Sequence, residues 1–98
     1  MTYGIDVPAD KVTMFADITK RMAEVYAAKN HDYGNSFSKS IEEFGLVAAA
    51  VRMNDKMERI KSLVKAQESN RCVKDETIED TLLDLANYAV MTLVELKS

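Results

Sequence analysis

Apolar residues recur every three or four positions over three long segments of this chain, and this spacing predicts three α-helices. The first helix is expected to open near Asp6 and Pro8, with Asp6 as its cap and Pro8 in its first turn. It ends near Asn30, because the polar segment from His31 to Ser36 predicts a loop. Its apolar positions are Val12, Phe15, Ile18, Met22, Val25 and Tyr26.

The second predicted helix begins at Ser40, which forms a capping box with Glu43, and runs to about Gln67. Gly45 leaves open whether this segment is one helix or a short helix followed by a long one. The polar segment from Gln67 to Lys74 predicts a second loop. The apolar stripe of this helix is Leu46, Ala50, Met53, Met57, Ile60 and Val64.

The third predicted helix is capped by Asp75 and runs to about Leu96. Its second half is apolar nearly all round, which is typical of a buried helix. We therefore expect one all-α domain over residues 1–98, with three main helices in a four-helix-bundle-like arrangement. The third helix carries more apolar surface than two neighbours can cover, so a homo-oligomer, a dimer or a tetramer, would complete the bundle.

Composition narrows the classes of partner. Thirteen Lys and Arg residues against sixteen Asp and Glu give a net charge of −3, which gives no reason to expect binding to duplex nucleic acid. The lone Cys72 cannot form an internal disulfide. The sequence contains neither a signal peptide nor an apolar run of membrane length, so we expect a cytoplasmic protein with no membrane partner.

The strongest candidate for chemistry is a row of oxygens on the third helix. Asp80, Asp84 and Asn87 are spaced i, i+4 and i+7, so they lie on one helix face. Acids that point toward a core need a cation, a base or another partner. On the second helix, Asp55 and Glu58 share a face in the same way.

If these two faces meet, four carboxylates converge and cannot all stay ionised without a cation. Hard oxygen ligands favour Mg²⁺, which commonly bridges to substrate phosphates and so points to phosphoryl or pyrophosphoryl chemistry. The alternative is that Asp80 only favours the helix N-terminus and that Asp84 pairs with Arg52 or Arg59 across a helix interface. The predicted metal ligands are Asp55, Glu58, Asp80 and Asp84.

Two further segments would suit a phosphorylated ligand. Arg52, Lys56 and Arg59 form a basic flank that would contact a phosphate, or else a solvated face with i, i+4 ion pairs. In the segment from Lys29 to Phe37, Tyr33 or Phe37 would stack on a base, and Lys29 or His31 would contact phosphate. The alternative is a helix C-terminus closed by Gly34, with His31 at the negative end of the dipole.

Three motifs resemble the nucleotide modification associated domain family, whose members are small proteins frequent in phages and their bacterial hosts. The resemblance covers about residues 25–96. The motifs are Lys29-x-x-Asp32-Tyr33-Gly34, Arg52-x-x-Asp55-Lys56-x-x-Arg59-Ile60 and the block from Asp75 to Tyr88. That family is in turn similar to the all-α nucleoside triphosphate pyrophosphohydrolases, the MazG and dimeric dUTPase group.

The resemblance implies a MazG-like bundle in which acids on two adjacent helices bind Mg²⁺ and a metal-positioned water attacks near the α-phosphate. The pattern of that group is Glu-x-x-Glu on one helix and Glu-x-x-Asp on the next. Here Asp55-x-x-Glu58 stands for the first pair, and Asp80 with Asp84 for the second. The chain departs from the pattern by Asp at position 55 and by a four-residue spacing in the second pair.

The expected function is that of a Mg²⁺-dependent pyrophosphohydrolase-like protein acting on a nucleoside triphosphate, NTP or dNTP, in nucleotide metabolism or modification. Asp84 and Glu58 would be catalytic. The alternatives are a non-catalytic helical oligomer that binds a nucleotide or a protein, and a purely structural role in which the acids form interface salt bridges. The predicted substrate-binding residues are Lys29, Asp32, Tyr33, Lys56, Arg59 and Asn87.

Overall fold

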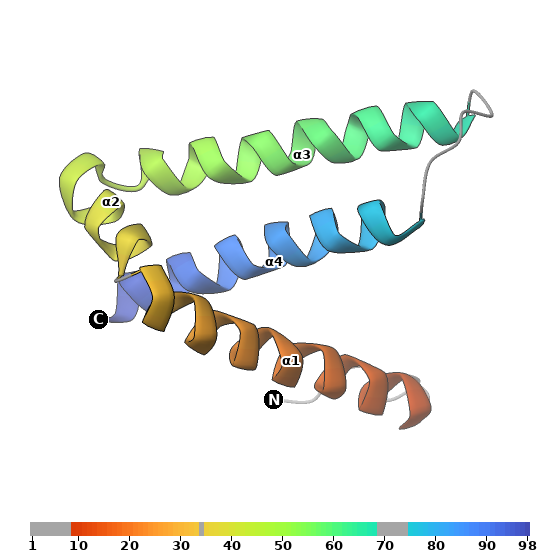
Figure 1. Ribbon diagram of the computed structural model, residues 1–98, viewed down its shortest axis with the longest axis horizontal. Coiled ribbons are helices and arrows are strands. Elements are labelled where there is room, and N and C mark those ends of the chain that lie inside the picture. Colours follow the sequence, from red (N-terminus) through yellow and green to blue (C-terminus); the bar gives the residue numbers. More distant parts are fainter. Residues whose placement is uncertain (1–8, 34, 69–74) are drawn as a thin grey trace. The chain divides into compact units, whose positions relative to one another are not determined.

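A computed structural model describes residues 9–33, 35–68 and 75–98 of the chain (Figure 1). These residues form four α-helices and no strand, which confirms the all-α prediction. The first predicted helix corresponds to α1, the second divides into α2 and α3, and the third corresponds to α4. The helices are α1 (Ala9–Tyr33), α2 (Ser36–Phe44), α3 (Val47–Glu68) and α4 (Asp75–Lys97).

The chain divides into two compact units, residues 1–34 and 35–98, and each is described by itself. The described part of the first unit is the 25-residue helix α1. The predicted end of this helix near Asn30 was wrong, because the helix continues through His31 to Tyr33. The predicted cap Asp6 and the nearby Pro8 lie outside the described residues. The division into two compact units does not test whether residues 1–98 form a single domain, so the single domain stays a prediction.

Helix α2 begins four residues earlier than the capping box predicted. Asn35 precedes it with a φ of 62°, in the left-handed region, and forms no side-chain cap. The hydroxyl of Ser40 instead donates to the carbonyl oxygen of Ser36 at 3.1 Å, inside the helix. The break at Gly45 is confirmed: α2 ends before it and α3 begins at Val47.

Gly45 has a φ of 75° and a ψ of −167°, a backbone conformation that is almost restricted to glycine. We expect Gly45→Ala to lower the free energy of unfolding by about 1–3 kcal/mol. The cost is conformational rather than steric, because a Cβ at this position meets no atom within 4 Å. Urea unfolding monitored by circular dichroism measures the change.

Asn35→Gly is the matched control, because it places glycine at the other described residue with a positive φ. It should leave stability unchanged or raise it slightly, since glycine adopts this conformation without a Cβ penalty. If Gly45→Ala and the wild type were equally stable, alanine would adopt this backbone conformation without strain, which would contradict the argument that the turn requires glycine.

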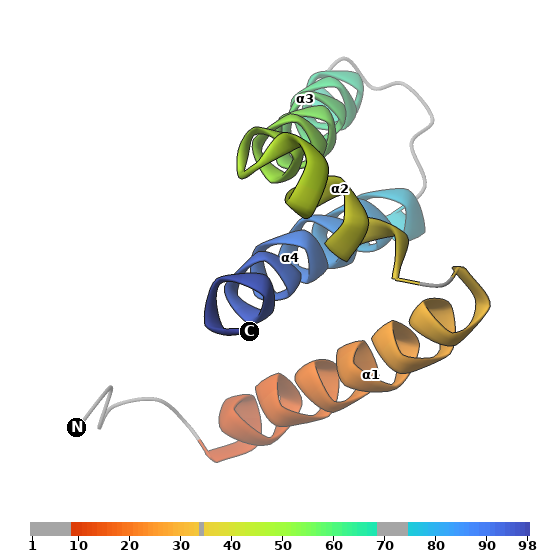
Figure 2. The same cartoon turned by 90° about the vertical axis from the view of Figure 1, so that its left-hand side faces the viewer.

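Helices α3 and α4 run antiparallel, side by side, and α2 crosses at the end where α3 begins (Figures 1 and 2). Residues with reduced exposure recur on α3 every three or four positions, from Ala49, which is 1% exposed, to Leu63. Ala50, Met57 and Val64 of the predicted stripe are exposed, so the packing face is rotated relative to the prediction. The observed stripe is Ala49, Met53, Lys56, Ile60 and Leu63.

Helix α2 is also linked to α4. The rings of Phe37 and Tyr88 lie 5.7 Å apart between centroids, at an interplanar angle of 40°. The hydroxyl of Ser38 donates a partly buried hydrogen bond of 2.8 Å to a carboxylate oxygen of Glu95. These contacts join segments that are more than fifty residues apart in the sequence, so α2, α3 and α4 form one packed unit.

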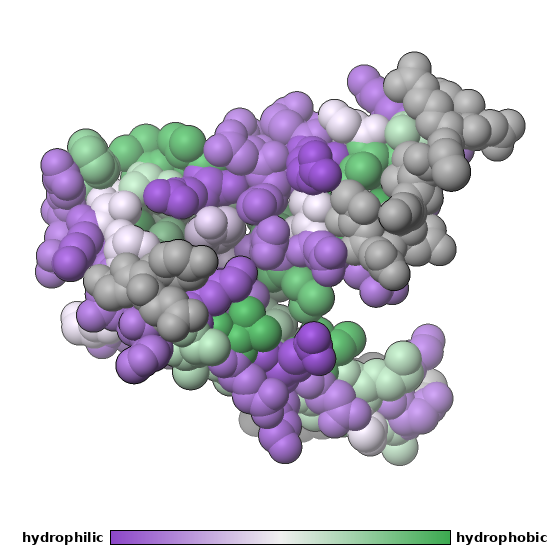
Figure 3. All heavy atoms as spheres, viewed as in Figure 1, coloured by the Kyte–Doolittle hydropathy of each residue, from purple (hydrophilic) through white to green (hydrophobic). Residues whose placement is uncertain are grey.

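Large apolar side chains remain exposed in the second unit. One group surrounds the α2–α3 junction and forms the green patch at the upper left of Figure 3, and another lies on α4. Among the described residues, no helix combines the length and the hydropathy needed to cross a membrane. The exposed apolar residues of the two groups are Phe44, Leu46, Val47 and Val51 at the junction, and Leu82, Val90, Leu93, Val94 and Leu96 on α4.

Candidate functional site

An ion pair joins α3 and α4 near the middle of both helices. The Nζ atom of Lys56 lies 3.0 Å from Oδ2 of Asp84, and the two side chains are 30% and 41% exposed. A pair this accessible contributes about 0–1 kcal/mol to stability, because water screens both charges. The pair is therefore easily opened, and a small ligand can reach both groups.

Asp84 belongs to an acidic row on one edge of α4. Asp80 lies one turn before it and is exposed, and Asn87 lies nearly one turn after it and is half-buried. The continuous helix from Asp75 to Lys97 keeps the three side chains on one face, as their spacing predicted. Together they offer two carboxylates and one carboxamide.

A basic row runs along α3 with the same spacing. Arg52 and Arg59 stand at i−4 and i+3 from Lys56, and both are exposed. Neither guanidinium forms an ion pair or a hydrogen bond with another described residue. Because the helices are antiparallel and Lys56 touches Asp84, the two rows run side by side. We call them together the charged edge: Arg52, Lys56 and Arg59 on α3, and Asp80, Asp84 and Asn87 on α4.

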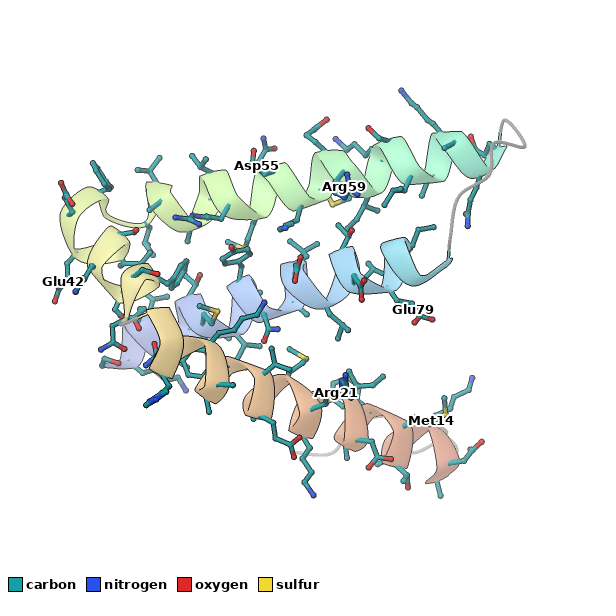
Figure 4. All side chains as sticks on the ribbon, in the orientation of Figure 1. Met14, Arg21, Glu42, Asp55, Arg59 and Glu79 are labelled. Atoms are coloured by element: carbon teal, nitrogen blue, oxygen red, sulfur yellow. The ribbon has the colours of Figure 1, made fainter. Side chains whose placement is uncertain are left out.

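Asp55 and Glu58 do not join this edge. Figure 4 shows Asp55 on the side of α3 that is farther from α4. Glu58 follows Lys56 by two residues, about 200° around the helix, and forms an exposed pair with Lys61 at 3.2 Å. The rotation of the packing face toward Ala49 explains this, because it directs Lys56 rather than the acids toward α4.

The four predicted metal ligands are consequently not gathered within this one chain. In the described ranges, no three Asp, Glu, His or Cys side chains are grouped so as to hold a metal ion. Asp80 and Asp84 still fit the common mode in which Mg²⁺ takes one or two carboxylates and completes its shell with waters and phosphate oxygens. The Mg²⁺ site stays a prediction.

The candidate ligand contacts of α1 belong to the first unit. Lys29 and His31 are exposed in the last turns of that helix. The backbones of Asp32 and Tyr33 are helical, while their side chains and Gly34 lie outside the described part of the chain. Their role as nucleotide contacts stays a prediction, and so does the alternative of a helix end closed by Gly34.

Two features were not foreseen from the sequence. The alternative to a metal site had Asp84 pair with Arg52 or Arg59, but its partner is Lys56. The signal was present, since Lys56 lies three residues after Met53 and four before Ile60, inside the apolar stripe. The ring of Phe37 contacts Tyr88, a residue to which the sequence pattern assigned no role.

Comparison with known proteins adds one match. The family described as "Nucleotide modification associated domain 1" matches residues 29–96, which include the whole charged edge. Neither a search of curated proteins nor a search of solved structures found a matching protein.

Proposed function

Because this chain belongs to the Nucleotide modification associated domain 1 family, we propose that it acts on a nucleoside triphosphate as a Mg²⁺-dependent, pyrophosphohydrolase-like protein. The observation that carries the proposal is the Lys56–Asp84 pair between a basic row and an acidic row. The two rows offer the two kinds of group that a metal–triphosphate complex requires: carboxylates for the cation and cationic donors for the phosphates.

The ion pair supports the proposal through its accessibility and its small free energy. Without ligand, Lys56 and Asp84 neutralise each other across the helix interface. A metal–triphosphate complex brings a cation for Asp84 and an anion for Lys56, so each charge exchanges one partner for another. The exchange gives up only about 0–1 kcal/mol of ion-pair stability, which new charge-assisted contacts readily offset.

The roles of the remaining groups follow from their places on the edge. Asp80 and Asp84 would hold the metal, Asn87 would orient the substrate or a water, and Arg59 would bind phosphate with Lys56. Bound Mg²⁺ supplies charge neutralisation at the phosphate oxygens and a more acidic water. A water oxygen would form a bond to the α-phosphorus, and the bond between that phosphorus and the α,β-bridging oxygen would break. The bridging oxygen leaves with pyrophosphate, and the proton of the water passes to solvent.

Glu58 limits the catalytic part of this proposal. It was expected to be catalytic, but within one chain it lies on the opposite side of α3 from Lys56 and pairs with Lys61. Catalysis by a single chain would therefore rest on Asp84. This placement favours a second candidate function, a helical module that binds a nucleotide without hydrolysing it.

A nucleotide panel separates the two functions. The protein is incubated with Mg²⁺ and each NTP and dNTP, and released pyrophosphate is converted to phosphate by added pyrophosphatase and detected. Thermal shifts are recorded for the same mixtures. Turnover that requires Mg²⁺ supports the enzyme, and stabilisation without product supports the binding module. A panel with neither turnover nor stabilisation would contradict both functions.

We also propose that the functional form is a homo-oligomer. The apolar residues exposed at the α2–α3 junction and on α4 support it, because large apolar patches on a helical unit commonly mark an interface. Equilibrium sedimentation at micromolar concentration should give the mass of a dimer or a tetramer. A monomer mass throughout that range would remove this part of the proposal.

A further inference from the structure

We propose that Arg52 is a specificity-determining residue of the charged edge, which selects a chain of three phosphates over a single phosphate. The inference rests on the proposed function, because it concerns the same ligand site. It gives a specific task to Arg52, which the proposed function includes only as a member of the basic row, and it makes the length of the phosphate chain the feature that this residue selects.

The basic row is long enough to contact several phosphates of one chain. Arg52 and Arg59 are separated by seven residues, which is about 10 Å along a helix at about 1.5 Å per residue. Lys56 stands between them, so the cations follow one line with about one turn between neighbours. A single phosphate reaches only part of this line, whereas a phosphate chain can lie along it and contact its members in turn.

The row on α4 carries its negative charge at one end only. Because α3 and α4 are antiparallel, Arg59 lies toward the Asp80 end of the edge and Arg52 toward the Asn87 end. The two acids of the α4 row therefore lie at the Arg59 and Lys56 end of the edge, while the member of that row at the Arg52 end is an uncharged carboxamide. A metal held by Asp80 and Asp84 would neutralise the phosphates nearest to Arg59 and Lys56. Arg52 is then placed to bind the phosphate that lies farthest from the metal.

The guanidinium of Arg52 is well suited to bind a phosphate. A guanidinium binds phosphate through two parallel hydrogen bonds, which a lysine cannot reproduce. Arg52 is exposed, and it forms no ion pair or hydrogen bond with another described residue. Its donors are therefore not committed to holding the fold together.

The test is isothermal calorimetry with inorganic tripolyphosphate, pyrophosphate and orthophosphate in saturating Mg²⁺, on the full chain. The wild type should bind tripolyphosphate most tightly. Arg52→Gln should weaken tripolyphosphate binding about tenfold, the effect of losing one hydrogen-bonded charge contact, and leave orthophosphate binding nearly unchanged. Arg52→Lys should fall between the two, because it keeps the charge and loses the planar fork.

Lys61→Gln is the matched control, since it removes one positive charge from the opposite side of α3. It should leave the preference for tripolyphosphate intact. An equal loss for all three anions in Arg52→Gln, or no loss at all, would overturn the inference. The proposed function is judged separately by nucleotide turnover and stabilisation, so either can fail while the other stands.

Discussion

Replacing Asp84 by Asn is expected to lower Mg²⁺-dependent pyrophosphate release at least about 100-fold, the scale seen when one electrostatic contributor is removed from an active site. Asp84 is the carboxylate that pairs with the basic row, so its replacement would remove the partner of Lys56 and, under the proposed function, one ligand of the metal. The measurement is the initial rate of pyrophosphate release from the most active nucleotide of the panel, with and without Mg²⁺.

The fold should survive this substitution. The Lys56–Asp84 pair is part-exposed and contributes no more than about 1 kcal/mol, so the thermal midpoint should change little. Asp17→Asn is the charge-matched control, because Asp17 is an exposed acid on α1 outside the region matched to the family. Undiminished turnover in a folded Asp84→Asn protein would exclude Asp84 as a catalytic residue.

Replacing Ala49 by Leu is expected to lower the free energy of unfolding by about 1–3 kcal/mol. Ala49 is 1% exposed on the packing face of α3, so three added carbons have no solvent to enter and must displace neighbours. Urea unfolding should show a lower midpoint concentration, with a slope close to that of the wild type.

Ala50→Leu is the internal comparison for this experiment. The next residue along the same helix is exposed, so the larger side chain meets solvent and should change stability by no more than about 0.5 kcal/mol. If Ala50→Leu were the more damaging of the two substitutions, the packing face of α3 would have to be turned back toward the stripe that the sequence predicted.

The helices could be predicted because their apolar periodicity is a local property of the chain. Their ends were harder, as α2 shows. A side-chain capping box at Ser40 was the expected start, but the helix begins beyond Asn35, whose backbone takes a left-handed conformation without a side-chain cap. Such a start depends on backbone geometry, which residue types alone do not determine.

The sequence predicted the residues that α4 contributes to the candidate site but not the side of α3 that meets them. Asp80, Asp84 and Asn87 share a face because the helical period alone decides it. Which side of α3 meets them depends on how α3 is rotated about its own axis, and small residues such as Ala49 decide that by allowing close packing. The sequence pattern directed Asp55 and Glu58 toward the third helix, whereas packing directs Lys56 there.

Helix α2 depends on contacts with residues of α4 that are distant in the sequence. A nine-residue helix is marginal in water on its own, so α2 persists through what it touches. Phe37 contacts Tyr88, and Ser38 bonds Glu95 in the last turns of α4. Fraying at the C-terminal end of α4 would break the Ser38–Glu95 bond and so remove one of the contacts that hold α2, which also packs against α3. Residues near the two ends of this unit, distant in sequence, therefore support each other's position.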